Sequence, residues 1–240
     1  MTLSIVIPTK NEETFLPRLF ASIREQQGID YEMIVADAHS TDRTREIVLG
    51  AGGRVVDGGM PGVGRNCGAR VAQGEFIAFF DADVLLPTPT YLADVVREMR
   101  ARELDVATGS IQPESTRVID RVFCHAYNTY AHLTMPFHPH AAGFCLFARR
   151  AAHEQIHGFD ETVVFAEDMD YIARAKRSGC SVGFLHVTPI CMSVRRFDRD
   201  GRWKTAAQYL FTEAHMLVKG PVKKELFEYK MGSYNDDKKD

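Results

Sequence analysis

Two aspartates separated by one small residue stand in the segment Phe80-Asp81-Ala82-Asp83. Carboxylates this close repel each other unless a cation lies between them. Hard oxygen ligands suit Mg²⁺ or Mn²⁺, which often bridge protein carboxylates and a diphosphate. A solvated turn is the alternative, but the apolar run at 76–80 predicts that the pair ends a buried strand. We therefore expect Asp83 to bind a divalent metal directly and Asp81 to support the metal or a ribose.

A second acidic pair, Glu167-Asp168, follows the run at 163–166 and begins a predicted helix. A carboxylate at a helix N-terminus is stabilised as the anion. Such a group can act as a general base that removes a proton from a hydroxyl at neutral pH. Helix capping without catalysis is the alternative interpretation.

An alternation of strands and helices must position these carboxylates. Short apolar runs predict strands at residues 3–7, 31–36, 54–56 and 75–80, and helical spacing predicts helices at 11–27, 41–49 and 62–73. This pattern predicts an α/β protein with a mostly parallel central sheet flanked by helices. In such sheets ligands bind at the carboxyl ends of the strands. Polar residues follow three of these strands, at 9–12, 37 and 81–83, and we expect them to form one site.

The second half of the chain has a less regular pattern. Strands are predicted at 105–112, 143–149 and 181–187, and helices at 118–134 and 168–178. The segment 203–217 is amphipathic, and we expect it to pack on the sheet as core. Because several arginines precede its apolar face, a helix lying in a membrane interface is the alternative. The charged segment 221–240 predicts a flexible tail.

The composition narrows the class of protein. The chain has 240 residues and a formal net charge of −3, which gives no electrostatic case for nucleic-acid binding. Its five cysteines form no CxxC pair, so we expect no thiolate zinc site and a reduced, cytoplasmic setting. We also expect neither a signal peptide nor a transmembrane span, because no apolar stretch approaches about 18 residues. Peripheral contact at the inner face of the membrane stays open.

Five segments, in order along the chain, resemble the family 2 glycosyltransferases that have the GT-A fold. They are SIVIPTKNE at 4–12, DAHSTD at 37–42, GRNCG at 64–68, FDAD at 80–83 and AED at 166–168. The resemblance implies a single Rossmann-like nucleotide-binding domain, which we expect over residues 1–220. Within it, residues 1–104 are expected to bind a nucleotide-sugar and residues 105–220 an acceptor. The resemblance further implies Mn²⁺ or Mg²⁺ as cofactor and inversion at the anomeric carbon.

The resemblance also assigns roles to single residues. It makes Asp168 the general base and Glu167 a residue that supports the base or binds the acceptor. It places Asp37 against the nucleobase, where a carboxylate suits an N–H donor of uracil or guanine, and Arg65 beside the nucleobase or the diphosphate. The donor site as a whole is implied to comprise Pro8, Thr9, Asn11, Glu12, Asp37, Arg65, Asp81, Ala82, Gly143, Arg195 and Arg196.

Some of these assignments have alternatives. Gly143 would let the backbone approach the donor sugar or the acceptor. Arg195 and Arg196 lie in a predicted basic loop at 194–203, which resembles a segment that closes over the donor and can stabilise the leaving diphosphate. An ordinary basic surface loop is the alternative there. His186 could complete the metal site, although a lone histidine at a strand end is more often structural.

The sequence departs from the family pattern at Ala38, where many relatives carry a second Asp, and at His39, where Gly is common. These departures weaken the assignment of the nucleobase, so UDP-sugar and GDP-sugar donors both stay open. The acceptor also stays open, and both a lipid-linked and a glycan acceptor are compatible with the sequence. We expect acceptor specificity to reside in the polar and aromatic stretch at 125–140.

Two other functions compete with a glycosyltransferase. A nucleotidyltransferase that makes a nucleotide-sugar would need a glycine-rich, basic loop near the N-terminus, which the segment at 8–12 lacks. A non-catalytic nucleotide-binding module is disfavoured because Asp81, Asp83 and Asp168 are all retained.

Overall fold

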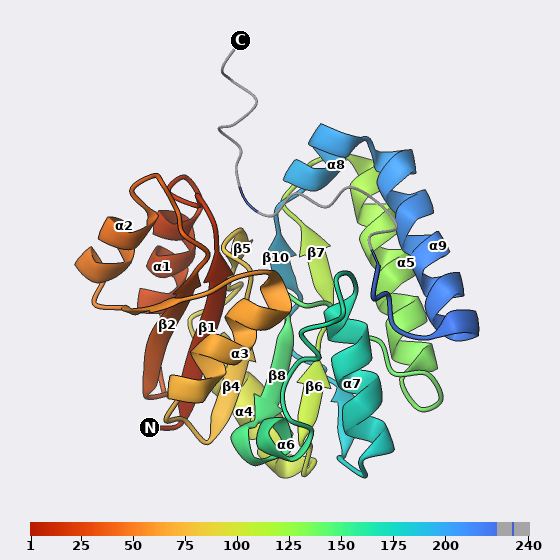
Figure 1. The fold of residues 1–240 in the computed structure, drawn as a ribbon, viewed down its shortest axis with the longest axis horizontal. Helices are drawn as coiled ribbons and strands as arrows, with labels where there is room; N and C mark the ends of the chain where they lie inside the picture. Colours follow the sequence, from red (N-terminus) through yellow and green to blue (C-terminus); the bar gives the residue numbers. More distant parts are fainter. Residues whose placement is uncertain (225–231, 233–240) are drawn as a thin grey trace.

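A seven-stranded sheet forms the centre of the computed structural model, which describes residues 1–224 and 232 (Figure 1). Strand β8 is antiparallel to both of its neighbours, and the other adjacent strands pair in parallel. The predicted α/β architecture with a mostly parallel sheet is therefore confirmed. In spatial order the strands are β3 (Arg54–Asp57), β2 (Tyr31–Asp37), β1 (Leu3–Thr9), β4 (Phe76–Phe79), β8 (Leu146–Arg149), β6 (Val106–Thr108) and β9 (Val182–Phe184).

Helices cover both faces of this sheet because its central strands are apolar on both sides. In β1 the side chains of Ile5 and Ile7 pack into one hydrophobic cluster, and Val6 packs into another on the opposite face. The first cluster includes residues of α1 (Leu16–Arg24), α2 (Thr44–Gly50) and α4 (Tyr91–Ala101). The second includes residues of α3 (Pro61–Val71), α6 (Arg150–Gln155) and α7 (Glu167–Arg177).

A second, three-stranded sheet lies beside the first and was not predicted. It consists of β5 (Val84–Leu85), β10 (Ile190–Met192) and β7 (Ile111–Pro113). The strand expected at 105–112 is therefore two strands, β6 and β7, in different sheets. This small sheet matters for the site because the Ser193 N–H donates to the Asp83 carbonyl across 3.1 Å. It thereby brings the segment after β10 against the predicted metal pair.

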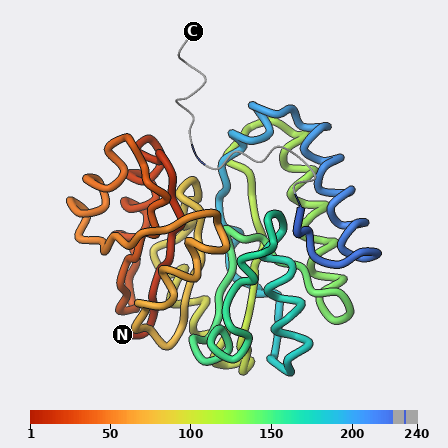
Figure 2. Tube along the Cα trace, viewed as in Figure 1, coloured from red at the N-terminus to blue at the C-terminus, as the bar shows by residue number. Residues whose placement is uncertain are grey.

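The predicted basic loop at 194–203 is partly helical, which corrects the sequence-based expectation. Helix α8 spans Arg195–Asp200, and α9 (Arg202–Lys219) follows it directly. Helix α9 lies beside α5 (Val118–Thr134) at the edge of the molecule, away from the central sheet (Figures 1 and 2). The Arg202 guanidinium bonds to the carboxylate of Asp120 at the start of α5, at 2.6 Å.

The expectation that α9 packs on the sheet as core is wrong. The side chain of Leu210 is 72% exposed and that of Leu217 is 60% exposed. Among the described residues, no helix has the length and apolar character needed to cross a bilayer. The expected tail at 221–240 falls for the most part outside the described residues.

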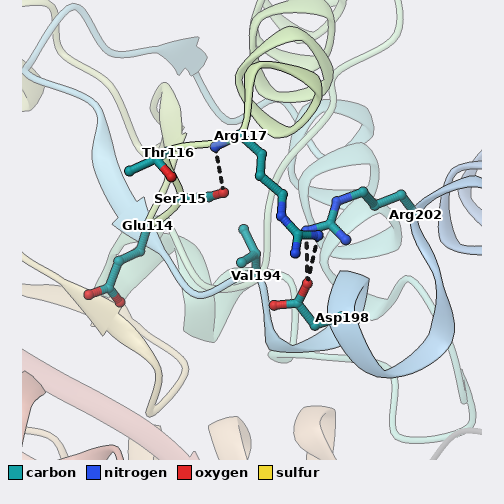
Figure 3. A pocket seen from close by; sticks show the side chains of 7 residues that line it. All are labelled: Glu114, Ser115, Thr116, Arg117, Val194, Asp198 and Arg202. Atoms are coloured by element: carbon teal, nitrogen blue, oxygen red, sulfur yellow. Dashed lines mark hydrogen bonds and ion pairs between the residues drawn. The ribbon is translucent and has the colours of Figure 1, made fainter.

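A surface pocket of about 530 Å³ lies where the chain enters α5 and α8 (Figure 3). Figure 3 shows the Arg117 and Arg202 side chains converging on Asp198, with Val194 beside them. The pocket contains none of the residues that were predicted to bind the metal, to bind the donor or to act as the general base. The lining residues are Glu114, Ser115, Thr116, Arg117, Val194, Asp198 and Arg202.

Candidate active site

The three predicted polar groups meet at the carboxyl edge of the sheet. Thr9 ends β1 and pairs in register with Asp37 at the end of β2, while Asp81 follows β4 on the other side of β1. The loops that leave this edge contain non-glycine residues with positive φ, including Asn11 at 54° and His39 at 56°. Glycine is favoured in that left-handed region, which fits the expectation from the family resemblance that Gly would stand at the position of His39.

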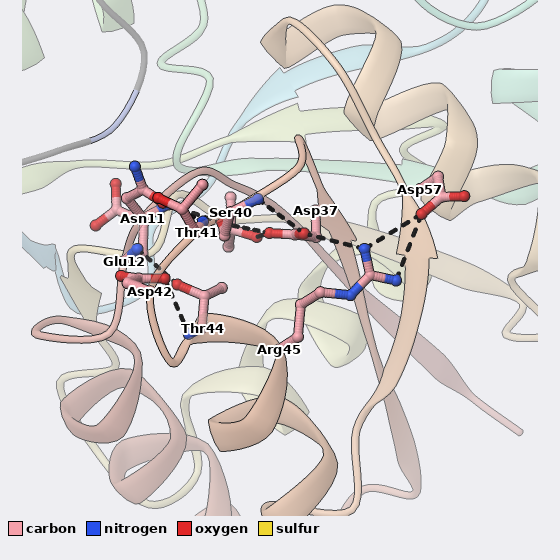
Figure 4. A network of polar contacts seen from close by, with 10 residues as sticks. Asn11, Glu12, Asp37, Ser40, Thr41, Asp42, Thr44, Arg45 and Asp57 are labelled. Atoms are coloured by element: carbon pink, nitrogen blue, oxygen red, sulfur yellow. Dashed lines mark hydrogen bonds and ion pairs between the residues drawn. The ribbon is translucent and has the colours of Figure 1, made fainter.

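The Asp37 carboxylate is buried in a network that the protein itself completes (Figure 4). Its Oδ1 accepts from the Ser40 hydroxyl at 2.5 Å, and its Oδ2 accepts from the Ser40 N–H at 3.1 Å and from Arg45 Nη1 at 3.3 Å. The neighbouring Asn11 Oδ1 accepts from the Thr41 N–H at 2.8 Å. Contact of Asp37 with a nucleobase stays a prediction, and it requires Ser40 or Arg45 to move.

The guanidinium of Arg195 contacts two carboxylates, one from Asp83 of the predicted metal pair and one from Glu12. Its Nε lies 2.7 Å from Oδ2 of Asp83, and its two terminal nitrogens each lie 2.8 Å from an oxygen of Glu12. Burial raises the pKa of Asp83 to about 7; Arg195 opposes this shift, and the charges of Asp81 and Glu12 add to it. Burial likewise raises the pKa of Glu12, although Arg195 again opposes it. The three acids therefore form a site that needs positive charge.

Arg65 connects the metal pair to the second acidic pair. The guanidinium is buried, with Nη2 2.9 Å from Oδ1 of Asp81 and Nη1 paired with the carboxylate of Glu167. It also lies over the Phe159 ring, 5.5 Å from the centroid. Two fixed hydrogen bonds to carboxylates suit the forked geometry of arginine. A residue of α3 thus holds together loops that are more than 80 positions apart in the sequence.

Asp168 lies in the first turn of α7, and Ala166, the residue that precedes this helix, has a φ of 57°. Burial raises the pKa of Asp168 to about 7; the charge of Glu167 adds to this shift, and Arg65 and a Gly143 backbone hydrogen bond oppose it. A carboxyl group with a pKa near neutrality is suited to proton transfer. A left-handed residue before the helix is a strained feature of the kind found at functional sites.

Gly143 packs against both charged groups. A Cβ atom at this position would stand 2.9 Å from Nη2 of Arg65 and 3.1 Å from Oδ2 of Asp168. The absence of a side chain therefore serves the approach of Arg65 and Asp168 to the backbone. Its predicted contact with the donor sugar or the acceptor stays a prediction.

The carboxylate oxygens at this site fit a hard divalent cation that is bound by the protein and by a diphosphate together. Among the described residues, no group of three or more His, Cys, Asp and Glu side chains is arranged to hold a metal ion without other ligands. Mg²⁺ is commonly bound in this way, through one or two carboxylates and the phosphates of a substrate. Asp81 and Asp83 supply the carboxylates, and Glu12 adds a third acid beside them that pairs with Arg195.

His186 does not join the metal pair. Its Nδ1 lies 3.2 Å from Oε1 of Glu98, and its side chain is 62% exposed. It follows β9, the outermost strand of the sheet, and β8 and β6 separate that strand from β4. Asp81 and Asp83 follow β4, so the position of β9 in the sheet explains why His186 is not a third ligand.

The family assignment rests on residues 4–156, which match the sequence profile described as Glycosyl transferase family 2. The chain belongs to this family. A curated relative, the 4,4'-diaponeurosporenoate glycosyltransferase of Staphylococcus haemolyticus, is 32% identical over 145 residues, which are 57% of this chain. The match covers 36% of that relative, so the chain spans about a third of its length.

Solved structures show that this family 2 chain has the GT-A fold. S. aureus TarS in complex with UDP-GlcNAc superposes with a TM-score of 0.66 at 21% identity, covering 80% of this chain and 58% of that chain. The mannosyltransferase PcManGT from Pyrobaculum calidifontis, solved with GDP-Man and Mn²⁺, superposes with a TM-score of 0.67 at 22% identity. This match covers 80% of this chain and 56% of that chain.

Helix α9 contributes polar side chains that the sequence analysis did not predict as part of the site. Glu213 of α9 accepts a hydrogen bond from the Tyr130 hydroxyl at 2.6 Å and lies 3.0 Å from Nε2 of His138. Tyr209 of α9 stacks under the Arg196 guanidinium, 5.2 Å from its ring centroid. Polar residues recur at helical spacing along α9, and that pattern was the available signal. It comprises Thr205, Gln208, Tyr209, Thr212 and Glu213.

Tyr127 of α5 and His140 are members of the predicted acceptor stretch that have a buried polar atom without a hydrogen-bond partner among the described residues, and the group in question on Tyr127 is its hydroxyl. Burial raises its pKa well above 10, and the negative charge of Asp168 adds to the shift. A buried hydroxyl without a partner is costly, so this group is available to a ligand near Asp168.

Proposed function

We propose that the chain transfers a sugar from a UDP-sugar or GDP-sugar to an acceptor hydroxyl, with a divalent metal and with inversion at the anomeric carbon. The observation that carries this proposal is Arg65, which bonds to Asp81 with one arm and to Glu167 with the other. Asp81 of the proposed metal pair and Glu167, the neighbour of the proposed base, thus lie on either side of one buried cation. In this proposal residues 1–104 hold the donor and residues 105–220 shape the acceptor site.

The proposed binding of the nucleotide-sugar depends on the charged side chains of the site. Asp81 and Asp83 would hold Mn²⁺ or Mg²⁺ together with the diphosphate, and the metal, when bound, neutralises the charge of that leaving group. TarS was solved with UDP-GlcNAc and PcManGT with GDP-Man and Mn²⁺, which supports a nucleotide-sugar and a divalent ion here. Arg195 lies beside Asp83, where a guanidinium can bond to phosphate oxygens, and the proposal assigns the next residue, Arg196, to the same donor site.

In the proposed reaction Asp168 is the general base. Its carboxylate takes the proton of the acceptor hydroxyl while the acceptor oxygen forms a bond to the anomeric carbon. The bond from that carbon to the diphosphate oxygen breaks in the same displacement, and its electron pair leaves with the nucleoside diphosphate. A single displacement of this kind inverts the configuration. The charges of Glu167 and Arg65 adjust the pKa of Asp168 in opposite directions.

The test compares Asp168→Asn with the wild type for turnover and for donor binding. Removing the base should lower kcat by about 10²–10⁴-fold, while thermal stabilisation by UDP or GDP with Mn²⁺ is kept. Glu161→Gln, which changes an exposed acid paired with Arg70, is the control and should keep full turnover. The wild type should release nucleoside diphosphate in the presence of Mn²⁺ and none with a chelator.

Three results would contradict the proposal. A product with retained anomeric configuration would exclude the single displacement. Release of pyrophosphate in place of nucleoside diphosphate would indicate a nucleotidyltransferase. Full turnover in Asp168→Asn would remove this residue from the role of base.

A further inference from the structure

Helix α9 presents an apolar stripe to solvent. Trp203, Leu210 and Leu217 are 73%, 72% and 60% exposed. These positions are separated by seven residues, or two helical turns, so they lie on one side of the helix. Exposed alanines fill the positions between them, which makes the stripe continuous: Trp203, Ala207, Leu210, Ala214 and Leu217.

The inward side of α9 is polar, which is the reverse of an ordinary surface helix. Thr205 and Thr212 are buried, and Glu213 faces Tyr130 and His138. Hydrogen bonds and an ion pair therefore fix the helix against α5, and its apolar residues are left for the outside. A continuous apolar surface of this kind marks an interaction site.

The exposed charges on α5 and α9 have one sign, although the acid Asp198 of α8 contacts Arg202 at the start of α9. Structure is described at every position of α5 and α9, and the only acids on the two helices are Asp120, which is buried under Arg202, and Glu213, which faces inward. Their exposed charged residues are all basic. These are Arg121, Lys204 and Lys219.

We propose that the outward face of α9 docks on the surface of an anionic lipid bilayer. An amphipathic helix with an apolar face and basic flanks lies in the plane of such an interface, and its basic residues are attracted to anionic headgroups. Lys204 and Lys219 lie near the two ends of the stripe, so an antiparallel second copy would bring like charges together. The inference rests on α9 alone and does not depend on the proposed transferase activity.

Docking on this face has a consequence for the site. Tyr209, on the same helix, contacts Arg196, and Glu213 anchors the stretch where acceptor specificity is expected. The bilayer would therefore lie against the acceptor side of the protein.

The chain contains a single tryptophan, Trp203, and it lies in the first turn of α9, so its fluorescence reports on this face directly. We expect its emission to shift to shorter wavelength with phosphatidylcholine vesicles that contain phosphatidylserine, and much less with phosphatidylcholine alone. The protein should float with the anionic vesicles at low salt. Binding should weaken as salt rises, because the screening length falls from about 10 Å at 0.1 M to about 3 Å at 1 M.

Two variants separate the apolar and the charged contributions. Leu210→Gln should weaken vesicle binding by about tenfold, since a buried leucine side chain is lost from the interface, with an unchanged melting temperature. Leu49→Gln on α2, where the side chain is 65% exposed, is the matched control and should bind like the wild type. Lys204→Gln with Lys219→Gln should remove most of the preference for anionic vesicles.

Several outcomes would overturn the proposal. Trp203 emission that stays unchanged with anionic vesicles at low salt, in a protein that does not float, excludes this docking surface. Equal binding by Leu210→Gln and Leu49→Gln would place the contact elsewhere. A dimer, detected by light scattering, that Leu210→Gln dissociates while no vesicle binding occurs would show that a second copy covers α9.

Discussion

Nε of Arg195 lies 2.7 Å from Oδ2 of Asp83, and this contact puts a guanidinium against the carboxylate proposed to bind the metal. Arg195 also spans both oxygens of Glu12. A cation that binds at Asp83 must therefore compete with Arg195, and the released guanidinium can then bond to the donor diphosphate.

Replacing Arg195 by Gln should strengthen the binding of Mn²⁺ in the absence of nucleotide. The competing guanidinium is removed, and although its loss raises the pKa of Asp83 further, the bound cation itself supplies the positive charge that favours the ionised carboxylate. Calorimetric titration with Mn²⁺ alone should give at least about tenfold tighter binding, which corresponds to about 1.4 kcal/mol. The control is Arg199→Gln, which changes a neighbouring arginine of α8 that pairs with Asp200 and should leave Mn²⁺ affinity unchanged. Equal affinities in the wild type and Arg195→Gln would exclude this competition.

The pH dependence of turnover tests the environment of Asp168. Burial raises its pKa to about 7, and a general base must be ionised. At saturating donor and metal, kcat should therefore fall by about tenfold per pH unit on the acid side of that pKa. Glu167→Gln removes a negative charge that raises this pKa. The acid limb of the pH profile, where kcat falls, should therefore move to lower pH.

The control for this shift is again Glu161→Gln, an exposed acid that should leave the limb in place. An acid limb that does not move in Glu167→Gln would assign it to a different group, such as Asp83, whose pKa burial also raises to about 7.

Much of the first half of the fold could be predicted because its strands are buried on both faces. The runs ending at Ile7, Ala36 and Phe80 are continuous and apolar, which is typical of parallel strands. Polar residues after such strands converge because parallel carboxyl ends share one edge of the sheet. The structure accordingly brings Glu12, Asp81 and Asp83 together, although their roles stay predictions.

What the sequence did not specify is the order of the strands and the direction each helix faces. His186 was expected to end a strand but lies two residues beyond the end of β9, and nothing local indicates that β9 is the outer strand of the sheet. The alternation of polar and apolar residues in α9 defines two faces but does not say which faces the protein. Helix α4 was missed although Leu92, Val95 and Met99 repeat at helical spacing.

Gly143→Ala should impair turnover without unfolding the protein. Its Cβ would meet Arg65 at 2.9 Å and Asp168 at 3.1 Å, so both side chains must shift. A displacement on the order of 1 Å at the base can lower kcat/KM by about 10²-fold. Gly50→Ala, which meets no atom within 4 Å, is the control and should keep full turnover. Wild-type kinetics in Gly143→Ala, with near-UV circular dichroism unchanged, would show that this contact does not position the base.

The buried ion pair between Arg65 and Glu167 should be costly to break. Their side chains are 2% and 15% exposed, and loss of one partner from a buried pair costs about 3–5 kcal/mol. Arg65→Gln leaves Glu167 and Asp168 without their shared cation, so the free energy of unfolding should fall by that order. The exposed pair of Arg70 and Glu161 is the control, and Arg70→Gln should cost about 0–1 kcal/mol. In the double variant Arg65→Gln/Glu167→Gln the uncompensated charge of Glu167 is absent, so denaturant titration should show much of the lost stability restored. A double variant no more stable than Arg65→Gln would mean that Arg65 stabilises the site by something other than the charge of Glu167.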